Sequence, residues 1–265
     1  MPDCRRGRPR EARDRPVVAP GIESDGHDRG DGDRSGVAVT ADLLVIVPSR
    51  GRPQNIKALW EAWEATSTGP ADLLVAADDD DPTLDDYRMV CGELGIELVV
   101  GPRLRMCPTL NRIAVERSPR HFAIGFMGDD HRPRTEGWTD RYLETLRELG
   151  TGFVYGNDLV ARERLPTQFA LTSDIVLALG AVVPAPVKHM YADNMIYDLG
   201  HDIDRIRYLP DVVVEHLHPI VGTAEDDAGY REVSAPEAFE ADRLVYAHWY
   251  EHDRPRDAEK LRALL

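Results

Sequence analysis

The sequence lacks several features that would mark particular classes of protein. Its 265 residues include only three cysteines, Cys4, Cys91 and Cys107, and no Cys-x-x-Cys pair, so neither a disulfide framework nor a thiolate zinc site is predicted. No apolar run approaches the roughly 18 residues that a membrane-spanning helix needs, and the N-terminus has no apolar core of the signal-peptide kind. We therefore expect a cytoplasmic protein without a transmembrane segment.

Positive charge is also scarce, because lysine occurs only three times and the formal net charge is -15. Sequence-independent binding of nucleic acid requires a basic surface, so no nucleic-acid binding is expected. The acidic balance does not exclude an anionic small substrate, because a bound metal ion can supply positive charge locally.

Large apolar side chains are almost absent from residues 1–40. Eight arginines and eight acidic residues lie within residues 1–36, so this segment is neutral and the net charge belongs to the rest of the chain. Such a composition buries too little surface to offset the entropy of ordering the chain. We expect residues 1–40 to be a disordered tail; the alternative is that translation begins near Val37 or Val39.

Beyond residue 40 the chain alternates between strand-like and helix-like patterns. Apolar runs predict buried strands at 42–49, 71–77, 96–101 and 121–128. Helical periodicity predicts helices between and after them, at 52–67, 84–95, 109–118 and 136–150. Repeated units of this kind predict an α/β fold with a mostly parallel sheet flanked by helices.

The pattern after residue 150 is less regular. Two further strands are predicted at 150–158 and 207–219, and two short helices at 173–181 and 192–203. A C-terminal helix over 236–251 either docks on the body or mediates association into a homodimer. The stretch 222–230 is predicted to be a mobile polar loop.

Three of the predicted strands end in polar clusters. In open α/β sheets, ligands bind beyond the carboxyl ends of the strands. If these strands are adjacent and parallel, their clusters meet at one edge of the sheet. The clusters are Pro48-Ser49-Arg50, Asp78 to Asp81, and Asp129-Asp130.

The adjacent carboxylates of Asp129 and Asp130 suit Mg²⁺ or Mn²⁺, which prefer oxygen ligands. The alternative is that one of them caps the helix expected near residue 135. The cluster Asp78 to Asp81 fails the test for a calcium loop, because no glycine occupies the sixth position and the spaced glutamate is missing. It is either a solvated turn or the place where Asp79 or Asp80 accepts an N–H from a nucleotide base.

Several other polar residues can each be interpreted in two ways. His216 and His218 are predicted on one face of a strand, because side chains alternate; they are either a metal pair or a half-buried histidine with an exposed neighbour. Asp193 is either a helix-terminus partner or a general base for an acceptor hydroxyl. Arg103 and Arg105 either neutralise a diphosphate or are solvated.

The order of these motifs resembles the nucleotide-sugar glycosyltransferases of the family 2 type. The matching motifs are VIVPSRGRPQNI, the acidic cluster, TLNRIAVERSPRHFAIGFMGDDHRP, ADN and EHLHP, over about residues 42–220. The resemblance implies a single GT-A-like domain at 41–220. Within it, residues 41–135 would be the nucleotide-binding half and 136–220 the acceptor half, followed by an acidic loop and C-terminal helices at 221–265.

The resemblance also implies roles for individual residues. It places the family's Asp-x-Asp motif on Gly128, Asp129 and Asp130, so Gly128 replaces the first carboxylate and Asp130 takes the main metal position. His216 or His218 would complete the metal shell, His131 would assist, and Asp193 would be the acceptor-side base, although Ala192 replaces its usual acidic neighbour. Together with Arg105, chosen for its charge, the expected donor-binding residues are Pro48, Ser49, Arg50, Arg52, Asp79, Asp80, Asn111 and Asp129.

The implied function is a metal-dependent glycosyltransferase that uses Mn²⁺ or Mg²⁺. It would move a sugar from a UDP- or GDP-sugar donor to an acceptor hydroxyl that the sequence does not identify. A sugar-phosphate nucleotidyltransferase is an alternative, but its first loop is usually glycine-rich with a lysine, whereas PSRGRPQN has one glycine and no lysine. A metal hydrolase using His216 and His218, and a silent sugar-binding protein, are further alternatives.

Overall fold

The computed structural model describes residues 41–224 and 226–265, with the side chain of residue 220 excepted. The predicted disordered tail, residues 1–40, and the alternative start near Val37 or Val39 lie outside the described residues. Among the described helices, none combines the length and the apolar character needed to cross a membrane.

Eight strands of the described chain form one curled sheet in the order β3-β2-β1-β4-β7-β6-β8-β5. Their bounds are β1 (Leu43–Ser49), β2 (Ala71–Asp78), β3 (Glu97–Gly101), β4 (Ala123–Phe126), β5 (His131–Pro133), β6 (Phe153–Asn157), β7 (Phe169–Thr172) and β8 (Ile206–His216). The pairs β1–β2, β1–β4, β2–β3 and β6–β8 are parallel. β7 runs antiparallel to β4 and β6, and β5 antiparallel to β8. The predicted α/β fold with a mostly parallel sheet is confirmed.

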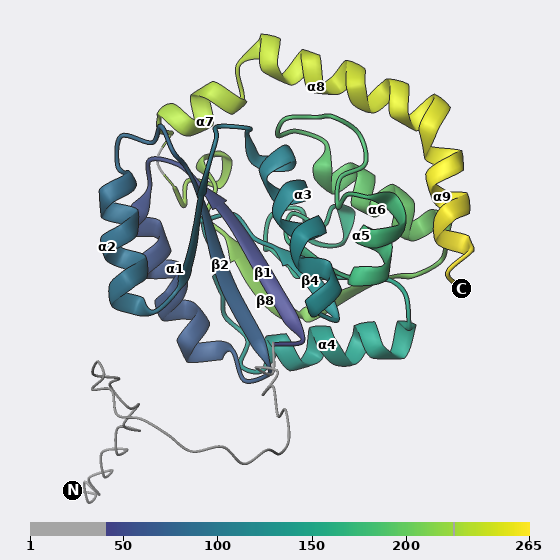
Figure 1. Ribbon diagram of the computed structural model, residues 1–265, viewed down its shortest axis with the longest axis horizontal. Coiled ribbons are helices and arrows are strands. Elements are labelled where there is room, and N and C mark those ends of the chain that lie inside the picture. Colours follow the sequence, from purple (N-terminus) through teal and green to yellow (C-terminus); the bar gives the residue numbers. More distant parts are fainter. Residues whose placement is uncertain (1–40, 225) are drawn as a thin grey trace, which may run out of the picture. The chain divides into compact units, whose positions relative to one another are not determined.

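Helices cover both faces of this sheet (Figure 1). Their bounds are α1 (Pro53–Thr66), α2 (Leu84–Leu94), α3 (Met106–Arg117), α4 (Trp138–Leu149), α5 (Ser173–Leu179), α6 (Ala192–Asp202), α7 (Ala228–Val233), α8 (Pro236–His248) and α9 (Arg254–Arg262).

The alternation of side chains along β1 explains the two layers. Leu44 and Ile46 point into a core that also contains residues of α3, α5, α6 and α9. Leu43, Val45 and Val47 point to the other side, into a core with residues of α1, α2 and α4. All five side chains are buried, which is why the strand is a continuous apolar run rather than an alternating one.

The sequence-based predictions missed several short elements. β7 has only four residues, too few for a periodic signal. A helix was expected soon after His131, but the three-residue strand β5 comes first and α4 begins at Trp138. The prediction of a loop at 222–230 was wrong in its last residues, because α7 begins at Ala228 with the Asp227 side chain accepting a hydrogen bond from the Tyr230 N–H.

The C-terminal helices dock on the body, which was one of the two outcomes expected. Asp242 of α8 is buried, and its carboxylate accepts backbone hydrogen bonds from Lys188, His189 and Met190 at 2.8–2.9 Å. These bonds fasten α8 to the loop that precedes α6. The outer side of α8 remains exposed at Phe239 and Leu244.

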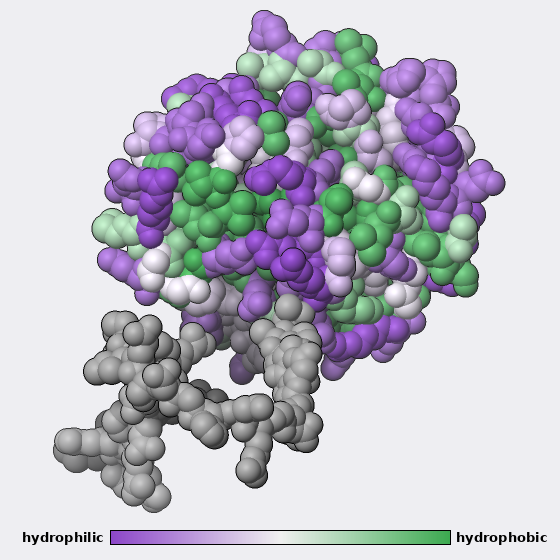
Figure 2. Space-filling model, in the orientation of Figure 1, coloured by the Kyte–Doolittle hydropathy of each residue, from purple (hydrophilic) through white to green (hydrophobic). Residues whose placement is uncertain are grey.

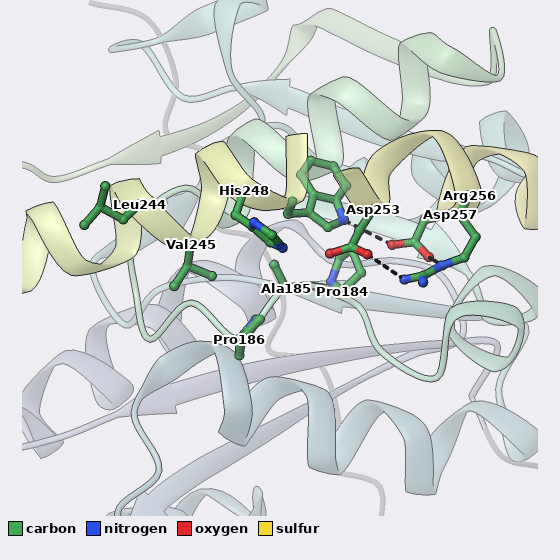
Figure 3. Close-up of a pocket in the computed structure, with 10 residues that line it drawn as sticks. Pro184, Ala185, Pro186, Leu244, Val245, His248, Asp253, Arg256 and Asp257 are labelled. Carbon is green, nitrogen blue, oxygen red and sulfur yellow. Dashed lines mark hydrogen bonds and ion pairs between the residues drawn. The ribbon is translucent and has the colours of Figure 1, made fainter. Parts of the chain in front are cut away.

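A cavity of about 340 Å³ lies where this loop meets the C-terminal helices (Figure 3). Pro184 to Pro186 line one wall, and the end of α8, the turn after it and the start of α9 line the other, where Trp249 Nε1 donates to Asp257 at 3.0 Å. None of its lining residues belongs to the strand-end clusters.

One face of the surface shows two hydrophobic areas separated by a hydrophilic band (Figure 2). One area overlies β2 and β3, and the other lies in the region of α5. Exposed apolar side chains in these elements include Val100 of β3 and Leu177 of α5.

Candidate functional site

The ends of three neighbouring strands bring the predicted polar clusters together. β1 lies between β2 and β4 and is parallel to both, so their carboxyl ends open on the same edge of the sheet. The Ser49 hydroxyl at the end of β1 donates to Asp129 Oδ2 at 2.5 Å. Arg50 donates to Asp78 at 2.9 Å and to Asp80 at 2.5 Å, which joins the ends of β1 and β2. The predicted convergence of the clusters is confirmed.

A tight turn after β4 presents Asp129 and Asp130. The His131 N–H donates to the Gly128 carbonyl at 3.1 Å, which leaves the two aspartates at the central positions of the turn. The buried guanidinium of Arg132 fastens the turn by donating to the Asp129 and His131 carbonyl oxygens, both at 2.7 Å. Neither aspartate caps a helix, because the N-cap of α4 is Gly137; the capping alternative is therefore wrong.

A side chain at position 128 would crowd the candidate metal ligands Asp130 and His131. A Cβ atom at this position would lie 2.5 Å from Asp130 Oδ1 and 3.1 Å from His131 Nδ1. An aspartate at position 128 would displace the Asp130 carboxylate. The departure from the Asp-x-Asp pattern therefore has a local steric reason.

Asp129 is buried and points to the β1 side of the site. Besides Ser49, its carboxylate accepts from Asn55 Nδ2 at 3.3 Å and from Arg52 at 3.4 Å. Burial raises the pKa of Asp129 to about 6, the negative charge of Asp130 adds to the rise, and Arg52 opposes it. The Asp129 carboxylate therefore accepts hydrogen bonds from side chains at the end of β1 and the start of α1.

Asp130, His131 and His216 form a group that could hold a metal ion. One candidate ligand atom from each residue lies within 4.8 Å of the other two. The antiparallel register of β5 and β8 pairs His131 with His216, so their rings stack with centroids 4.3 Å apart. Asp130 Oδ1 lies 3.2 Å from His131 Nδ1 and 3.6 Å from His216 Nε2.

The electrostatics of this group suit a cation. Burial alone would raise the pKa of Asp130, but the hydrogen bonds and charges of the two histidines hold that pKa well below its usual range. Burial, together with the charge of His216, lowers the pKa of His131. Both shifts favour the deprotonated forms, a carboxylate on Asp130 and a neutral imidazole on His131, in which these groups bind metal ions.

The imidazole of His131 is not fully hydrogen-bonded within the described part of the chain. It is buried, its Nδ1 accepts from the Gly128 N–H at 3.1 Å, and within the described part of the chain its buried Nε2 has no hydrogen-bond partner. Buried polar atoms in native proteins are almost always satisfied. The three residues therefore fit a divalent cation by charge and ligand type, and a cation on His131 would take the Nδ1 lone pair in place of the Gly128 N–H.

His218 lies outside this group. β8 ends at His216, so the strand alternation on which the predicted His216–His218 pair rested does not reach His218. The His218 ring packs edge-on against His216, with centroids 5.1 Å apart, and against Tyr230 at 5.4 Å. A metal-binding role for His218 stays a prediction.

α7 contributes a residue to the site that the sequence did not reveal. The Tyr230 hydroxyl donates to Asp130 Oδ2 and lies 3.2 Å from the Leu217 carbonyl oxygen. Arg52 stacks 4.4 Å above the Tyr230 ring and donates to Asp227 at 2.6 and 2.7 Å. The only available signal was Asp227, an N-cap residue type at the start of a short helix.

Arg103 and Arg105 also face α7. Glu232 accepts from Arg103 at 2.8 Å and from Arg105 at 2.5 Å. Arg103 Nε lies 3.9 Å from Asp78, so this pair is continuous with the end of β2. Both arginines are thus partly exposed and paired with α7, and binding of a diphosphate stays a prediction.

Asp193 lies in the first turn of α6. Burial raises its pKa, and backbone hydrogen bonds and the charge of His216 oppose the rise. Its Oδ1 accepts from the Asn194 N–H at 2.9 Å, as a helix-terminus carboxylate does. The helix-terminus interpretation describes this hydrogen bond, and a role as general base stays a prediction.

Three predicted donor-binding residues are less closely tied to the turn after β4. Pro48 is the penultimate residue of β1, in register with Ala76. Asp79 is exposed after β2, with its N–H donating to the Gly101 carbonyl at 2.7 Å. Asn111 uses its side-chain amide on the backbone of Val182 and Val183 at 2.8–2.9 Å.

Comparisons with known proteins agree with this architecture. No protein-family model and no curated protein matches the chain. The mannosyltransferase PcManGT from Pyrobaculum calidifontis, solved with GDP-Man and Mn²⁺, is similar with a TM-score of 0.57 and 13% identity, over 86% of this chain and 74% of that chain.

Two other solved structures are similar at comparable levels. TarS from S. aureus, in complex with UDP, has a TM-score of 0.52 and 12% identity, over 84% of this chain and 90% of that chain. Glucosyl-3-phosphoglycerate synthase from Mycobacterium tuberculosis, in complex with Mn²⁺, UDP and its product, has a TM-score of 0.51 and 15% identity, over 78% of each chain. The chain therefore has the GT-A fold of nucleotide-sugar glycosyltransferases.

Adding a side chain at position 128 should weaken metal binding. In Gly128→Ala the new methyl group would push against Asp130 Oδ1, so we expect the affinity for Mn²⁺ to fall by about 10–100-fold, the usual effect of disturbing the support of a metal ligand. Isothermal titration with Mn²⁺ measures this. Gly92→Ala on α2, where a Cβ meets open space, is the control, and equal affinity in both variants would contradict the geometry.

The raised pKa of Asp129 gives a pH dependence of defined sign. Its folded pKa of about 6 exceeds the ordinary value, so its stabilising contribution is complete below about pH 4 and is lost as pH rises through 6. Asp129→Asn lacks this loss. In urea unfolding with a chelator, we expect the variant to gain on the order of 2 kcal/mol over the parent between pH 4 and pH 7.

The exposed Asp85 on α2 supplies the control for this measurement. Asp85→Asn should follow the pH dependence of the parent protein. If Asp129→Asn also ran parallel to the parent across this range, the raised pKa of Asp129 would be refuted.

Proposed function

We propose that the protein is a metal-dependent glycosyltransferase that moves a sugar from a nucleotide-sugar donor to an acceptor hydroxyl. The observation that carries this proposal is the position of Asp130, His131 and His216 at the strand-end edge, next to Ser49 and Arg52. The fold supports the proposal, because the similar structures are glycosyltransferases solved with GDP-Man, UDP or Mn²⁺.

The candidate ligands favour Mn²⁺ over Mg²⁺. Mg²⁺ demands oxygen ligands in octahedral geometry, whereas two of the three groups here are imidazoles. Manganese accepts both kinds of ligand more readily. When bound, the cation would neutralise the diphosphate of the donor and stabilise it as a leaving group.

The residues around the cation site have complementary tasks. Arg52, whose guanidinium lies 3.4 Å from Asp129 and 4.0 Å from Asp130, would bind the diphosphate and share its negative charge. Ser49 and Asp129 would hold the β1 end in place. Asp79 or Asp80, at the end of β2, would accept an N–H from the uracil or guanine base.

Asp193 would act on the acceptor side. Its carboxyl group is half-buried and has a raised pKa, and a raised pKa makes a carboxylate a better proton acceptor near neutral pH. In this role it removes the proton from the attacking hydroxyl as the bond to the sugar forms. This assignment corresponds to a transferase that inverts the anomeric configuration.

The alternatives find less support. A nucleotidyltransferase would use a lysine in the loop after β1, but Ser49 to Asn55 contains none. A metal hydrolase based on His216 and His218 would need both in the metal group, and the described group contains His216 with His131 instead. Association into a homodimer through the exposed side of α8 stays a prediction.

Metal-dependent nucleotide binding tests the function. With Mn²⁺ present, UDP or GDP at 100 times its dissociation constant should stabilise the folded protein by about 2.7 kcal/mol, seen as a rise in Tm. Asp130→Asn should abolish the rise while leaving the Tm of the ligand-free protein in the folded range. Asp140→Asn on α4 is the control. Stabilisation by Zn²⁺ without any nucleotide would instead favour the hydrolase.

Substitution of Asp193 separates chemistry from donor binding. Asp193→Asn keeps the size and the backbone hydrogen bond but removes the base, so we expect kcat to fall by about 10²–10⁴-fold while the affinity for the nucleoside diphosphate stays the same. Initial rates of donor consumption with saturating acceptor measure kcat. An unchanged kcat would rule out Asp193 as the base.

A further inference from the structure

α7 is attached to the rest of the molecule mainly through charges. None of its residues is buried. Its N-cap residue Asp227 binds Arg52, and Glu232 near its other end binds Arg103 and Arg105. Figure 1 shows the helix at the rim of the sheet, beyond the arrowhead of β1. A short helix that buries none of its own residues, and is held by ion pairs and by Tyr230, opens at a lower cost in free energy than a core helix.

The carboxylates of α7 bind the same groups that an anionic ligand would need. Asp227 accepts two hydrogen bonds from Arg52, through Nε and one terminal nitrogen, and arginine binds phosphate oxygens in this same two-pronged way. Arg52 also lies within 4.0 Å of Asp130. A diphosphate held by a cation on Asp130 would therefore compete with Asp227 for this guanidinium.

The close contact between Arg52 and α7 depends on a glycine. A Cβ at Gly229 would lie 2.9 Å from a terminal nitrogen of Arg52, so a side chain at position 229 would push this guanidinium out of its present position. Tyr230, the next residue, donates to Asp130 and packs under Arg52. α7 thus covers a cation ligand and an anion-binding side chain at the same time.

Arg105 shows backbone strain at the other end of the contact. Its dihedral angles, φ 77° and ψ 173°, fall in a region that is almost exclusive to glycine and that costs about 1–3 kcal/mol for other residues. Such strain is concentrated at functional sites. The strained residue aims its guanidinium at Glu232, the second carboxylate of α7.

We propose that α7 is a displaceable latch, in which Asp227 and Glu232 occupy Arg52, Arg103 and Arg105 until the diphosphate of the donor takes their place. The proposal rests on the proposed function. The latch lowers the apparent affinity for the donor, because only the fraction of molecules with α7 displaced can bind it. It also covers Asp130 through Tyr230 while no donor is present.

The test replaces both carboxylates without changing their size. Asp227→Asn retains an N-cap residue for α7, and Glu232→Gln retains the side-chain length, so the double variant D227N/E232Q loses only the charges. If the latch is open in about one molecule in ten, the double variant should bind about 10-fold more tightly. Isothermal titration with UDP, GDP and inorganic pyrophosphate, each with Mn²⁺, measures the affinities.

Glu240→Gln supplies the matched control, since Glu240 forms an exposed ion pair with Arg243 on α8 and should leave the affinities unchanged. Hydrogen exchange at the amides of residues 228–233 gives a second readout. In the parent protein, we expect Mn²⁺ with pyrophosphate to speed this exchange, because the ligand displaces α7. In the double variant the exchange should be fast from the start.

The outcomes separate the latch from the function. Tighter binding by D227N/E232Q supports the latch, and binding by the variant alone supports it most strongly. If the parent binds and the double variant binds equally or more weakly, the latch is overturned while the glycosyltransferase proposal survives. If neither protein binds any of the three ligands with Mn²⁺, both proposals fail.

Discussion

Two adjacent buried carboxylates, Asp129 and Asp130, impose the constraint on which the rest of the site depends. Burying a carboxylate is costly unless hydrogen bonds or opposite charges compensate it, and here two must be compensated in one turn. The chain compensates them in opposite directions. The Asp129 carboxylate accepts hydrogen bonds from Ser49 of β1 and Asn55 of α1. The Asp130 carboxylate lies beside the imidazoles of His131 and His216 and accepts a hydrogen bond from the Tyr230 hydroxyl. The pKa values diverge accordingly, which assigns the ionised, cation-facing position to Asp130.

The replacement of a carboxylate by glycine at position 128 follows from the same arrangement. With the His131 Nδ1 accepting from the Gly128 N–H, a side chain at 128 would force the Asp130 carboxylate and the His131 ring to shift. In the proposed site, the His131 imidazole from β5 would take the place of the first aspartate of the Asp-x-Asp pattern that the sequence resembles. Exchanging a carboxylate for a neutral imidazole leaves the group less negative. This exchange favours a cation that accepts nitrogen ligands, and it leaves more of the diphosphate charge for arginine to balance.

The sequence predicted the parts of this site that lie at the ends of long apolar strands. β1, β2 and β4 were recognisable from their composition, and their parallel order placed Ser49, Asp78 and Asp129 together. The other contacts of the site could not be predicted from the sequence pattern, because they join residues that lie far apart in the sequence or in very short elements. His131 meets His216 only because the three-residue strand β5 pairs with β8, and three residues give no periodic signal. Tyr230 reaches Asp130 across 100 residues of chain, from a six-residue helix inside a polar stretch.

In the proposed enzyme, one divalent cation links the imidazoles at the strand ends to the diphosphate of a nucleotide. Pulsed electron paramagnetic resonance of Mn²⁺ bound to the protein, with UDP or GDP added, tests this link. We expect nitrogen couplings from His131 and His216 together with a phosphorus coupling from the nucleotide in the same complex. A Mn²⁺ signal with phosphorus but no histidine nitrogen, or with histidine nitrogen but no phosphorus, would contradict it.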